Sequence, residues 1–270
     1  MKKPLKILLA VTVLASFLLF QNFSLQKEEY ALLLSRLPES VQGLRVVHIS
    51  DLHGRSFGEN NARLLRKIQK AQPHIICITG DLFDENTDFS ALAPFLRELP
   101  RLAPTFYVTG NHEWQVAERK NYLRYMEALG IEVLENEHVL WAEDFVIAGV
   151  HDPCGPYDQK TPAELMAEIR REAGNDAFVL MLCHRNDGLK LWSELGADLV
   201  LSGHCHGGVV RLPFLGGVFA SERKFFPEFD SGLYGQEQTL LYVSRGLGYS
   251  NVPFRLLNRP QVSLLLLNRK

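Results

Sequence analysis

Short apolar runs alternate with amphipathic segments along most of the chain. The runs typical of buried strands cover 30–34, 44–50, 74–80, 105–110, 145–150, 177–183, 197–203, 239–246 and 262–267. Between them, apolar residues recur at helical spacing over 60–70, 90–98 and 120–129, and a capping sequence at Thr161 begins a helix over 161–171. Strands that alternate with helices predict an α/β fold, and neither a repeat nor a linker divides 28–270.

The first 27 residues have a different pattern. Three lysines precede an uncharged run over 7–25, whose apolar core ends at Phe20. A membrane span needs about 20 apolar residues, and a cleaved signal peptide needs a small-residue cleavage site, which does not follow here. We therefore predict a membrane anchor over 1–27 and one globular domain over 28–270. A cleaved signal peptide remains an alternative, whereas a buried soluble helix is disfavoured by the lack of a polar face.

The lysines before the apolar run also bear on topology. Lysines beside a span favour the cytoplasmic side, which would place 28–270 outside the inner or cell membrane. A short anchor can instead lie on one face of the bilayer, so the side of the globular domain stays open.

Composition narrows the classes of protein. The chain has 270 residues, of which 46% are hydrophobic and 22% charged, as in an ordinary globular protein. A net charge of -2 argues against a nucleic-acid partner, which a basic field would normally attract. The four cysteines form no C-x-x-C pair, so neither a zinc knuckle nor a thioredoxin-type site is indicated.

Side chains that can bind metals follow five of the predicted strands. They are Asp51 and His53, Asp81, Asn111 and His112, His184, and His204 and His206. Asp51 with His53, Asp81 and His184 are weak signals alone, because acids beside histidines, glycine–aspartate turns and single buried histidines are common. The glycines around His204 and His206 make that stretch the strongest single motif. The stretch Gly203-His204-Cys205-His206 fits a metal site, a thiol nucleophile or a histidine-rich turn. Open α/β sheets bind ligands beyond the carboxyl ends of their strands, so we expect these side chains to converge.

The joint pattern indicates two metal ions. Seven oxygen and imidazole donors are too many for one ion that keeps open positions, and they suit two ions that share a carboxylate. Mixed nitrogen and oxygen donors favour Mn, with Fe or Zn as alternatives, over an all-oxygen calcium site or a thiolate-rich structural zinc site. Two such ions can activate water and stabilise a phosphoryl transfer.

These motifs resemble those of the calcineurin-like metallophosphoesterase superfamily. The matching motifs are Asp51-x-His53, Gly80-Asp81, Gly110-Asn111-His112-Glu113, His184 and Gly203-His204-x-His206. The similarity covers 28–270 and extends to the membrane-anchored bacterial branch, which includes hydrolases of UDP-2,3-diacylglucosamine in lipid A biosynthesis. It implies a four-layer α/β/β/α sandwich of two mixed β-sheets, preceded here by the N-terminal hydrophobic helix.

The resemblance also implies a role for each matching residue. One ion is expected on Asp51, His53, Asp81 and His206. The second is expected on Asp81, which bridges, together with Asn111, His184 and His204. His112 matches the non-ligand histidine that stabilises developing charge or protonates the leaving oxygen.

Three positions depart from the pattern of this branch. Arg185-Asn186-Asp187 follows His184 where x-Pro-Asp is frequent, Cys205 replaces a common threonine, and Val209 replaces a common glutamine. The predicted ligand set is intact, so these departures bear on substrate preference rather than on activity.

Residues near these motifs give weaker signals. We predict that Arg55 and Arg245 bind substrate phosphate, although a surface charge is the simpler interpretation of either. The further candidates of this kind are Arg223, Lys224 and Arg255. Phe225, Phe226, Phe229 and Tyr234 either pack under a loop or form an acyl-chain or membrane-facing wall. His151-Asp152 is interpreted as a loop pair rather than as ligands.

Together these observations predict a membrane-anchored hydrolase. It would use two divalent metal ions to cleave phosphodiester or diphosphate bonds, with a lipid-linked substrate such as UDP-2,3-diacylglucosamine. A nuclease or general phosphodiesterase of the same superfamily and a non-catalytic scaffold with the same fold are the alternatives. The charge balance opposes a nuclease, and a scaffold would be expected to lack one of the ligands.

Overall fold

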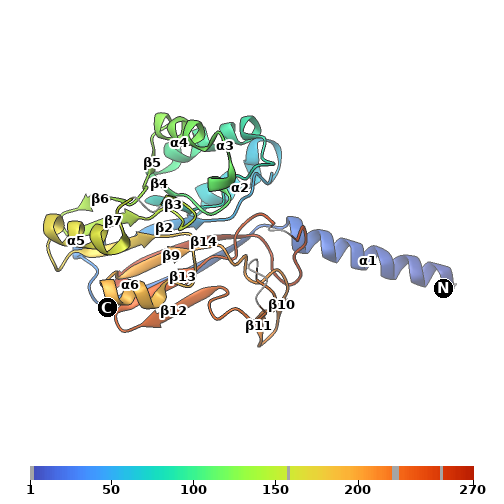
Figure 1. Cartoon of the computed structure of the whole chain (residues 1–270). Helices are drawn as coiled ribbons and strands as arrows, with labels where there is room; N and C mark the ends of the chain where they lie inside the picture. Colours follow the sequence, from blue (N-terminus) through green and yellow to red (C-terminus); the bar gives the residue numbers. More distant parts are fainter. Residues whose placement is uncertain (1–2, 157–158, 221–224, 250–251) are drawn as a thin grey trace.

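The computed structural model describes residues 3–156, 159–220, 225–249 and 252–270. Two six-stranded mixed sheets form its centre (Figure 1). The first sheet has, in spatial order, β1 (Gln26–Leu34), β14 (Gln261–Arg269), β2 (Leu44–Ile49), β3 (Ile75–Thr79), β4 (Thr105–Val108) and β5 (Ile131–Val133). Strands β2 to β5 are parallel, and β14 runs antiparallel to β2 but parallel to β1.

The second sheet is built in a similar way. Its spatial order is β12 (Gly232–Gln236), β13 (Thr239–Val243), β9 (Leu199–Ser202), β8 (Phe178–Leu182), β7 (Phe145–Gly149) and β6 (Glu137–Ala142). The four central strands are parallel, and both edge strands are antiparallel. The parallel centres place several carboxyl strand ends at one edge of each sheet.

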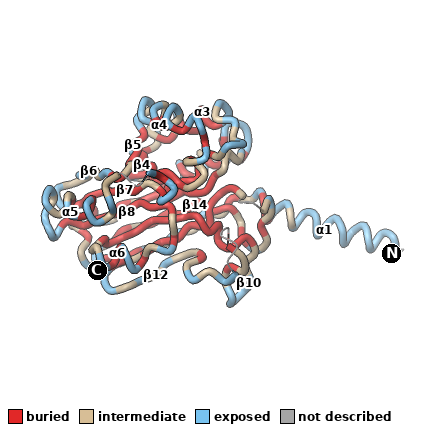
Figure 2. Tube along the Cα trace, in the orientation of Figure 1, coloured by how far each residue is buried: buried red, intermediate tan, exposed pale blue. Residues whose placement is uncertain are grey.

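Helices cover the outer face of each sheet, which gives the expected four layers. One outer layer contains α2 (Ala62–Lys70), α3 (Phe89–Leu102) and α4 (Arg119–Ala128), and the other contains α5 (Pro162–Ala173) and α6 (Leu189–Leu195). Three buried cores separate the layers (Figure 2). Neighbouring residues of one strand serve different cores, because side chains alternate between the two faces of a sheet. Val46 lies between the sheets, whereas Val47 packs under the helices.

Several elements were not predicted by the sequence pattern. They are the short helices η1 (Glu39–Val41), η2 (Glu59–Asn61) and η3 (Glu113–Gln115), the helix α6, the edge strands β5, β6 and β12, and the hairpin of β10 (Arg211–Leu212) and β11 (Gly216–Gly217). The predicted cap at Thr161 is confirmed as a reciprocal capping box with Glu164.

The N-terminal helix α1 (Lys3–Phe23) projects away from the sandwich (Figures 1 and 2). Its side chains are almost all exposed up to Phe20, whereas Gln21 and Asn22 are buried where the helix meets the domain. Its 21 residues are long and apolar enough to cross a membrane. At a rise of 1.5 Å per residue they would span about 31 Å, close to the thickness of a bilayer core.

Candidate metal centre

The side chains predicted to bind metal converge between the two sheets. Asp51 follows β2, Asp81 follows β3, and Asn111 follows β4, all in the first sheet. His184 follows β8 and His204 follows β9 in the second sheet. The carboxyl ends of five parallel strands therefore bring together residues from more than half of the chain.

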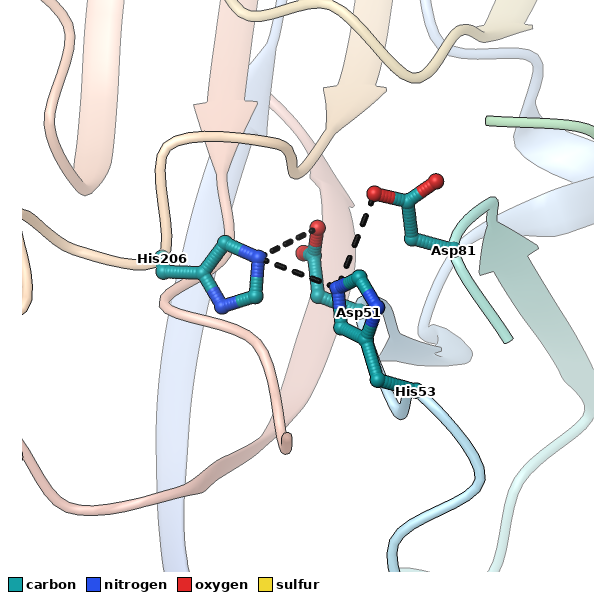
Figure 3. A group of neighbouring side chains, drawn as sticks. All are labelled: Asp51, His53, Asp81 and His206. Atoms are coloured by element: carbon teal, nitrogen blue, oxygen red, sulfur yellow. Dashed lines mark hydrogen bonds and ion pairs between the residues drawn. The ribbon is translucent and has the colours of Figure 1, made fainter. Parts of the chain in front are cut away.

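Four of these side chains form a first cluster. Asp51, His53, Asp81 and His206 each direct a donor atom at a common volume, and these atoms lie within 4.8 Å of one another (Figure 3). His53 Nε2 lies 3.2 Å from His206 Nε2 and 3.6 Å from Asp81 Oδ2, and His206 Nε2 lies 3.5 Å from Asp51 Oδ1. Two imidazole nitrogens and two carboxylates thus surround one small space.

A second cluster shares Asp81 with the first. The donor atoms of Asp81, His184 and His204 also lie within 4.8 Å of one another. His184 Nε2 is 3.2 Å from Asp81 Oδ2, 3.0 Å from His204 Nδ1 and 3.2 Å from Asn111 Oδ1. All seven residues predicted as ligands are therefore brought together, with Asp81 between the two groups.

The backbone at this site is unusual. Asp51, His53, Asp81, His204 and His206 all have positive φ, between 48° and 71°. Residues with side chains rarely adopt this left-handed conformation, and such strain concentrates at functional sites. These backbone turns lie in the loops that follow β2, β3 and β9, which carry the side chains of the two clusters.

Position 203 requires glycine because two loops approach each other closely there. A Cβ built at this position would lie 1.9 Å from Ser50 Oγ and 2.4 Å from Asp51 Oδ2. The His204 amide also donates to Asp51 Oδ1 over 3.0 Å. Only glycine lets the loop after β9 lie this close to the loop after β2, which brings His204 and His206 to Asp51.

The carboxylates give the site a strong preference for positive charge. Burial opposes the charge on His184, but Asp81 and Asp51 outweigh it and raise the pKa of His184 to about 10. Burial likewise opposes the charge on Asp81, yet His184 and His53 hold the pKa of Asp81 well below its usual range. His206 differs, because burial and the charges of His53 and Arg255 lower its pKa and keep the ring neutral.

The residues present fit two divalent cations. A field that draws protons onto histidines also attracts metal ions, and neutral imidazoles with ionised carboxylates are the forms that bind them. The donors are oxygen and nitrogen atoms, whereas Cys205 Sγ points away and donates to the Asp230 carbonyl over 2.8 Å. The identity of the metal is not defined by this donor set, so Mn stays a prediction.

Glu113 is a buried brace that the sequence analysis did not single out. Its carboxylate accepts hydrogen bonds from the amides of Asp81, Leu82 and Gly110 at 2.9, 2.6 and 2.8 Å. Burial and the charge of Asp81 raise the pKa of Glu113 to about 7. One side chain thus holds the loop that carries Asp81 against the loop that carries Asn111. An acidic residue two positions after Asn111 was visible in the sequence, but its role was not.

His112 lies at the border of the first cluster. Its ring centroid is 4.9 Å from that of His53, its amide donates to Asp81 Oδ1 over 2.9 Å, and Glu85 lies 3.9 Å from its Nδ1. It is half-buried, so its ring is open to solvent beside the predicted ligands. This position suits contact with a substrate, and its role in proton transfer stays a prediction.

The arginines predicted to bind substrate have partners within the protein. Arg55 donates to the Leu247 carbonyl over 3.1 Å, bonds the Asn22 carbonyl, and stacks on Tyr249. Arg245 bonds Glu28. Phosphate binding by either guanidinium stays a prediction. Arg223 and Lys224 lie outside the described residues.

Arg255 connects the N-terminal helix α1 to the candidate metal centre. Its amide donates to Asn22 Oδ1 over 2.8 Å, and Asn22 Nδ2 donates back to its carbonyl over 3.1 Å. Its buried guanidinium lies 3.4 Å from His206 Nδ1 and donates to the Arg245 and Gly248 carbonyls. A single side chain therefore separates the end of α1 from a predicted ligand.

The aromatic residues and the His151-Asp152 pair singled out in the sequence lie in different surroundings. Phe229 and Tyr234 pack against the core under α5 and α6, whereas Phe225 and Phe226 are exposed. His151 Nδ1 donates to the Asp152 carbonyl over 2.7 Å, and Asp152 accepts from Arg185 over 2.7 Å.

A pocket of about 290 Å³ opens beside His184. Its described lining includes His151, Arg185, Leu191 and Trp192. An apolar pocket that borders a predicted ligand offers space for a part of a substrate other than its phosphate.

The fold and the paired clusters form a candidate two-metal site, and the family comparison agrees with it. The model of the calcineurin-like phosphoesterase family matches residues 44–208, and the chain belongs to this family. The predictions of the family, of the sandwich fold and of a hydrolase are thereby confirmed.

Two curated relatives and one solved structure extend the comparison. The chain is 32% identical over 232 residues to the phosphodiesterase YaeI of Escherichia coli, covering 82% of this chain and 81% of that protein. It is 29% identical over 252 residues to a transmembrane protein with a metallophosphoesterase domain from Danio rerio, covering 87% of this chain but 55% of that protein. The Thermus thermophilus sulfate thiohydrolase SoxB shares the fold, with a TM-score of 0.52 and 14% identity over 86% of this chain and 57% of SoxB.

Proposed function

We propose that this chain is a membrane-anchored phosphohydrolase that uses two divalent metal ions to cleave a phosphodiester or diphosphate bond. The observation that carries the proposal is the position of Asp81, which contributes to both donor clusters. The phosphodiesterase named among the relatives supports the same bond type. In this proposal residues 1–27 form the anchor and 28–270 the catalytic domain.

Each cluster would hold one ion. Asp51, His53, Asp81 and His206 would hold the first, and Asp81, Asn111, His184 and His204 the second. When bound, a pair of such ions lowers the pKa of water and neutralises the charge on phosphoryl oxygens.

The chain itself supplies orientation and proton transfer. Glu113 fixes the two loops that carry Asp81 and Asn111, so those side chains need no rearrangement when substrate arrives. His112 would donate a proton to the leaving oxygen or a hydrogen bond to the developing charge, because its ring borders the cluster and remains half-exposed.

A membrane-embedded substrate suits the position of the site. The end of α1 is bonded to Arg255, and Arg255 reaches His206, so the metal centre lies beside the point where the anchor enters the domain. The relative named as a transmembrane protein supports anchoring. We therefore propose a lipid-linked phosphodiester or diphosphate, with UDP-2,3-diacylglucosamine as the named candidate, at the inner or cell membrane. The pocket beside His184 would take an apolar part of that substrate.

Metal-dependent turnover tests the catalytic proposal. The full chain in detergent is assayed with Mn²⁺ and bis-p-nitrophenyl phosphate, beside the variant Asp81→Ala and the surface control Glu194→Gln. We expect wild type and Glu194→Gln to be active only with metal, and Asp81→Ala to be inactive. Equal rates in wild type and Asp81→Ala would refute the proposal.

The lipid substrate is tested separately. UDP-2,3-diacylglucosamine in mixed micelles should release UMP with wild type and not with Asp81→Ala. If the protein hydrolyses the model diester but releases no UMP, the proposed lipid substrate is refuted and the proposed reaction class stands. A reporter fused after Lys270 shows on which side of the membrane the domain lies. Reporter activity only outside the cell would also refute a nucleotide-linked substrate located in the cytoplasm.

A further inference from the structure

We propose that the face of the domain around the end of α1 lies against the bilayer that α1 enters and binds anionic phospholipid headgroups there. The inference rests on the anchor proposed above and extends membrane contact from one helix to a surface of the folded domain. Two groups of side chains carry it: a basic collar on one side of the helix end and an apolar tip on the other.

The basic collar consists of Arg63, Lys67, Lys70 and Arg259. The first three are spaced four and three residues apart in α2, so they share one helix face. Arg63 and Lys70 are exposed, and Lys67 is half-buried.

The collar is bonded directly to the end of the anchor. Arg63 Nη2 donates to the Phe23 carbonyl over 2.9 Å, and Arg259 Nη2 donates to Ser24 Oγ over 2.7 Å. The Arg259 guanidinium also lies 4.6 Å over the Phe20 ring. These cations are therefore held where α1 leaves the domain, at the level at which headgroups would surround the helix.

The collar has an excess of positive charge. Burial, followed by the charges of Arg259, Lys27, Lys70 and Arg63, lowers the pKa of Lys67. The whole chain carries a net charge of -2, so this concentration of cations is local. Anionic lipids are the complementary partner, because basic groups beside a membrane helix are attracted to the negative surface of the leaflet.

The apolar tip lies at and around the β10–β11 hairpin. Phe214 is fully exposed and Leu215 is 64% exposed between the two strands. The same tip includes the exposed side chains of Leu212, Phe225, Phe226 and Leu257. Adjacent exposed aromatic and aliphatic side chains of this kind mark membrane or protein contact sites.

Backbone bonds hold the parts of the tip together. The Arg211 amide donates to the Leu256 carbonyl over 3.0 Å, and the Phe226 amide donates to the Val218 carbonyl over 3.0 Å. The Phe219 and Phe225 rings lie 5.2 Å apart. The exposed side chains are thus presented on a connected support.

The tip and the collar face the same side of the molecule. Only one residue separates Leu257 of the tip from Arg259 of the collar along the chain. Figure 1 shows α2 and the β10–β11 hairpin at the end of the domain from which α1 leaves, with β6 at the opposite end. A bilayer crossed by α1 would therefore meet cations on one side of the helix and apolar side chains on the other.

Spin-label accessibility in nanodiscs tests the contact. The full chain carrying Cys154→Ser receives one further change: Phe214→Cys at the tip, Leu140→Cys on β6 as the matched exposed control, or Leu14→Cys within α1. Each protein is labelled and reconstituted in phosphatidylcholine nanodiscs with and without phosphatidylglycerol. Oxygen partitions into the bilayer and a nickel chelate stays in water, so their relative effects report immersion.

We expect the labels at Phe214→Cys and Leu14→Cys to favour oxygen at least threefold more than the label at Leu140→Cys. The immersion of the Phe214→Cys label should increase with phosphatidylglycerol. Adding Lys67→Glu and Lys70→Glu should remove that increase, whereas Lys190→Glu on α6 should leave it.

The outcomes separate the two proposals. In one outcome the Leu14→Cys label is immersed, but the Phe214→Cys label is as exposed to water as the Leu140→Cys label. That outcome would overturn the proposed docking surface and leave the proposed anchor standing. A water-exposed Leu14→Cys label would overturn both. Immersion of Phe214→Cys that is unaffected by phosphatidylglycerol or by the two charge reversals would overturn the role of the collar. None of these measurements depends on hydrolysis.

Discussion

Single residues at this site are shaped by the backbone as much as by their side chains. Asp51 offers a carboxylate to the first cluster, accepts the His204 amide, and adopts a positive φ of 53°. The two histidines that flank Cys205 belong to different clusters, His206 to the first and His204 to the second. The thiol between them is turned away and buried, and burial raises its pKa to about 12.

Substitutions in this stretch should therefore separate thiol from imidazole chemistry. We expect Cys205→Ser to keep most of the metal-dependent activity, because its hydroxyl can also donate to the Asp230 carbonyl. His204→Ala and His206→Ala should each abolish it, since each removes a predicted ligand. Initial rates with Mn²⁺ and a model diester measure this. An inactive Cys205→Ser beside an active His206→Ala would restore the thiol mechanism.

Glu113 provides a second residue-scale prediction. Glu113→Gln replaces an acceptor oxygen with an NH₂ group that faces backbone donors, so the two loops should separate slightly. Loss of such a support commonly lowers metal affinity or activity about 10- to 100-fold. Activity as a function of Mn²⁺ concentration measures the loss.

The dependence of the rate on Mn²⁺ concentration distinguishes loss of ligand positioning from a general loss of folding. The half-saturating Mn²⁺ concentration of Glu113→Gln should rise, and high Mn²⁺ should recover most of the rate. Glu194→Gln changes an exposed glutamate on α6, serves as the control and should behave as wild type. A lower maximal rate at unchanged Mn²⁺ affinity would contradict the positioning role.

Residue types and their order were sufficient to predict which side chains converge in the candidate site, but not which residues support them. Asp51, His53, Asp81 and the later histidines follow apolar strands, and that position is visible in the sequence. The brace by Glu113 depends on three amides from two loops, which only the folded chain brings together. Arg55 and Arg245 look like phosphate-binding residues by position, yet tertiary contacts with Asn22 and Glu28 engage them.

At the scale of elements, the strands and helices that could be predicted are those with a regular pattern of apolar residues. The central strands such as β3 and β8 are buried along their whole length, so they read as continuous apolar runs. Edge strands such as β6 and β12 are partly exposed and carry no comparable signal. The helix α6 has only seven residues, too few for a clear helical period.

The joint between α1 and the domain gives an element-scale prediction. Asn22 is buried and exchanges two hydrogen bonds with the Arg255 backbone. Asn22→Ala leaves those groups without partners, which should lower the free energy of unfolding by about 1–3 kcal/mol. Thr12→Ala is the matched control, because Thr12 bonds within the exposed part of α1. Thermal unfolding of both full-length variants in detergent tests this, and equal stabilities would show that the joint contributes little.

The candidate metal centre lies where the two halves of the molecule meet. Its donors come from loops of both sheets, so ions bound there would link the two halves of the sandwich. Binding to the native state alone stabilises a protein by about 2.7 kcal/mol when the ligand concentration is 100 times its Kd.

Metal should therefore raise the melting temperature. For a domain of this size, about 2.7 kcal/mol corresponds to a rise of roughly 5–10 °C. We expect this rise when Mn²⁺ is added to chelator-treated wild type or Cys205→Ser, and its loss in Asp81→Ala. Differential scanning calorimetry measures the shift, and an equal rise in Asp81→Ala would place the stabilising ion elsewhere.

The link from α1 through Arg255 to His206 has a kinetic consequence. If the anchor is embedded, the bonds at Asn22 hold the centre at a fixed height above the membrane, and the domain has little freedom to reach into bulk water. Encounters with substrate would then occur by lateral diffusion in two dimensions. The rate would follow the mole fraction of substrate in the lipid rather than its amount per volume, so diluting it with inert lipid would slow the reaction while adding buffer would not.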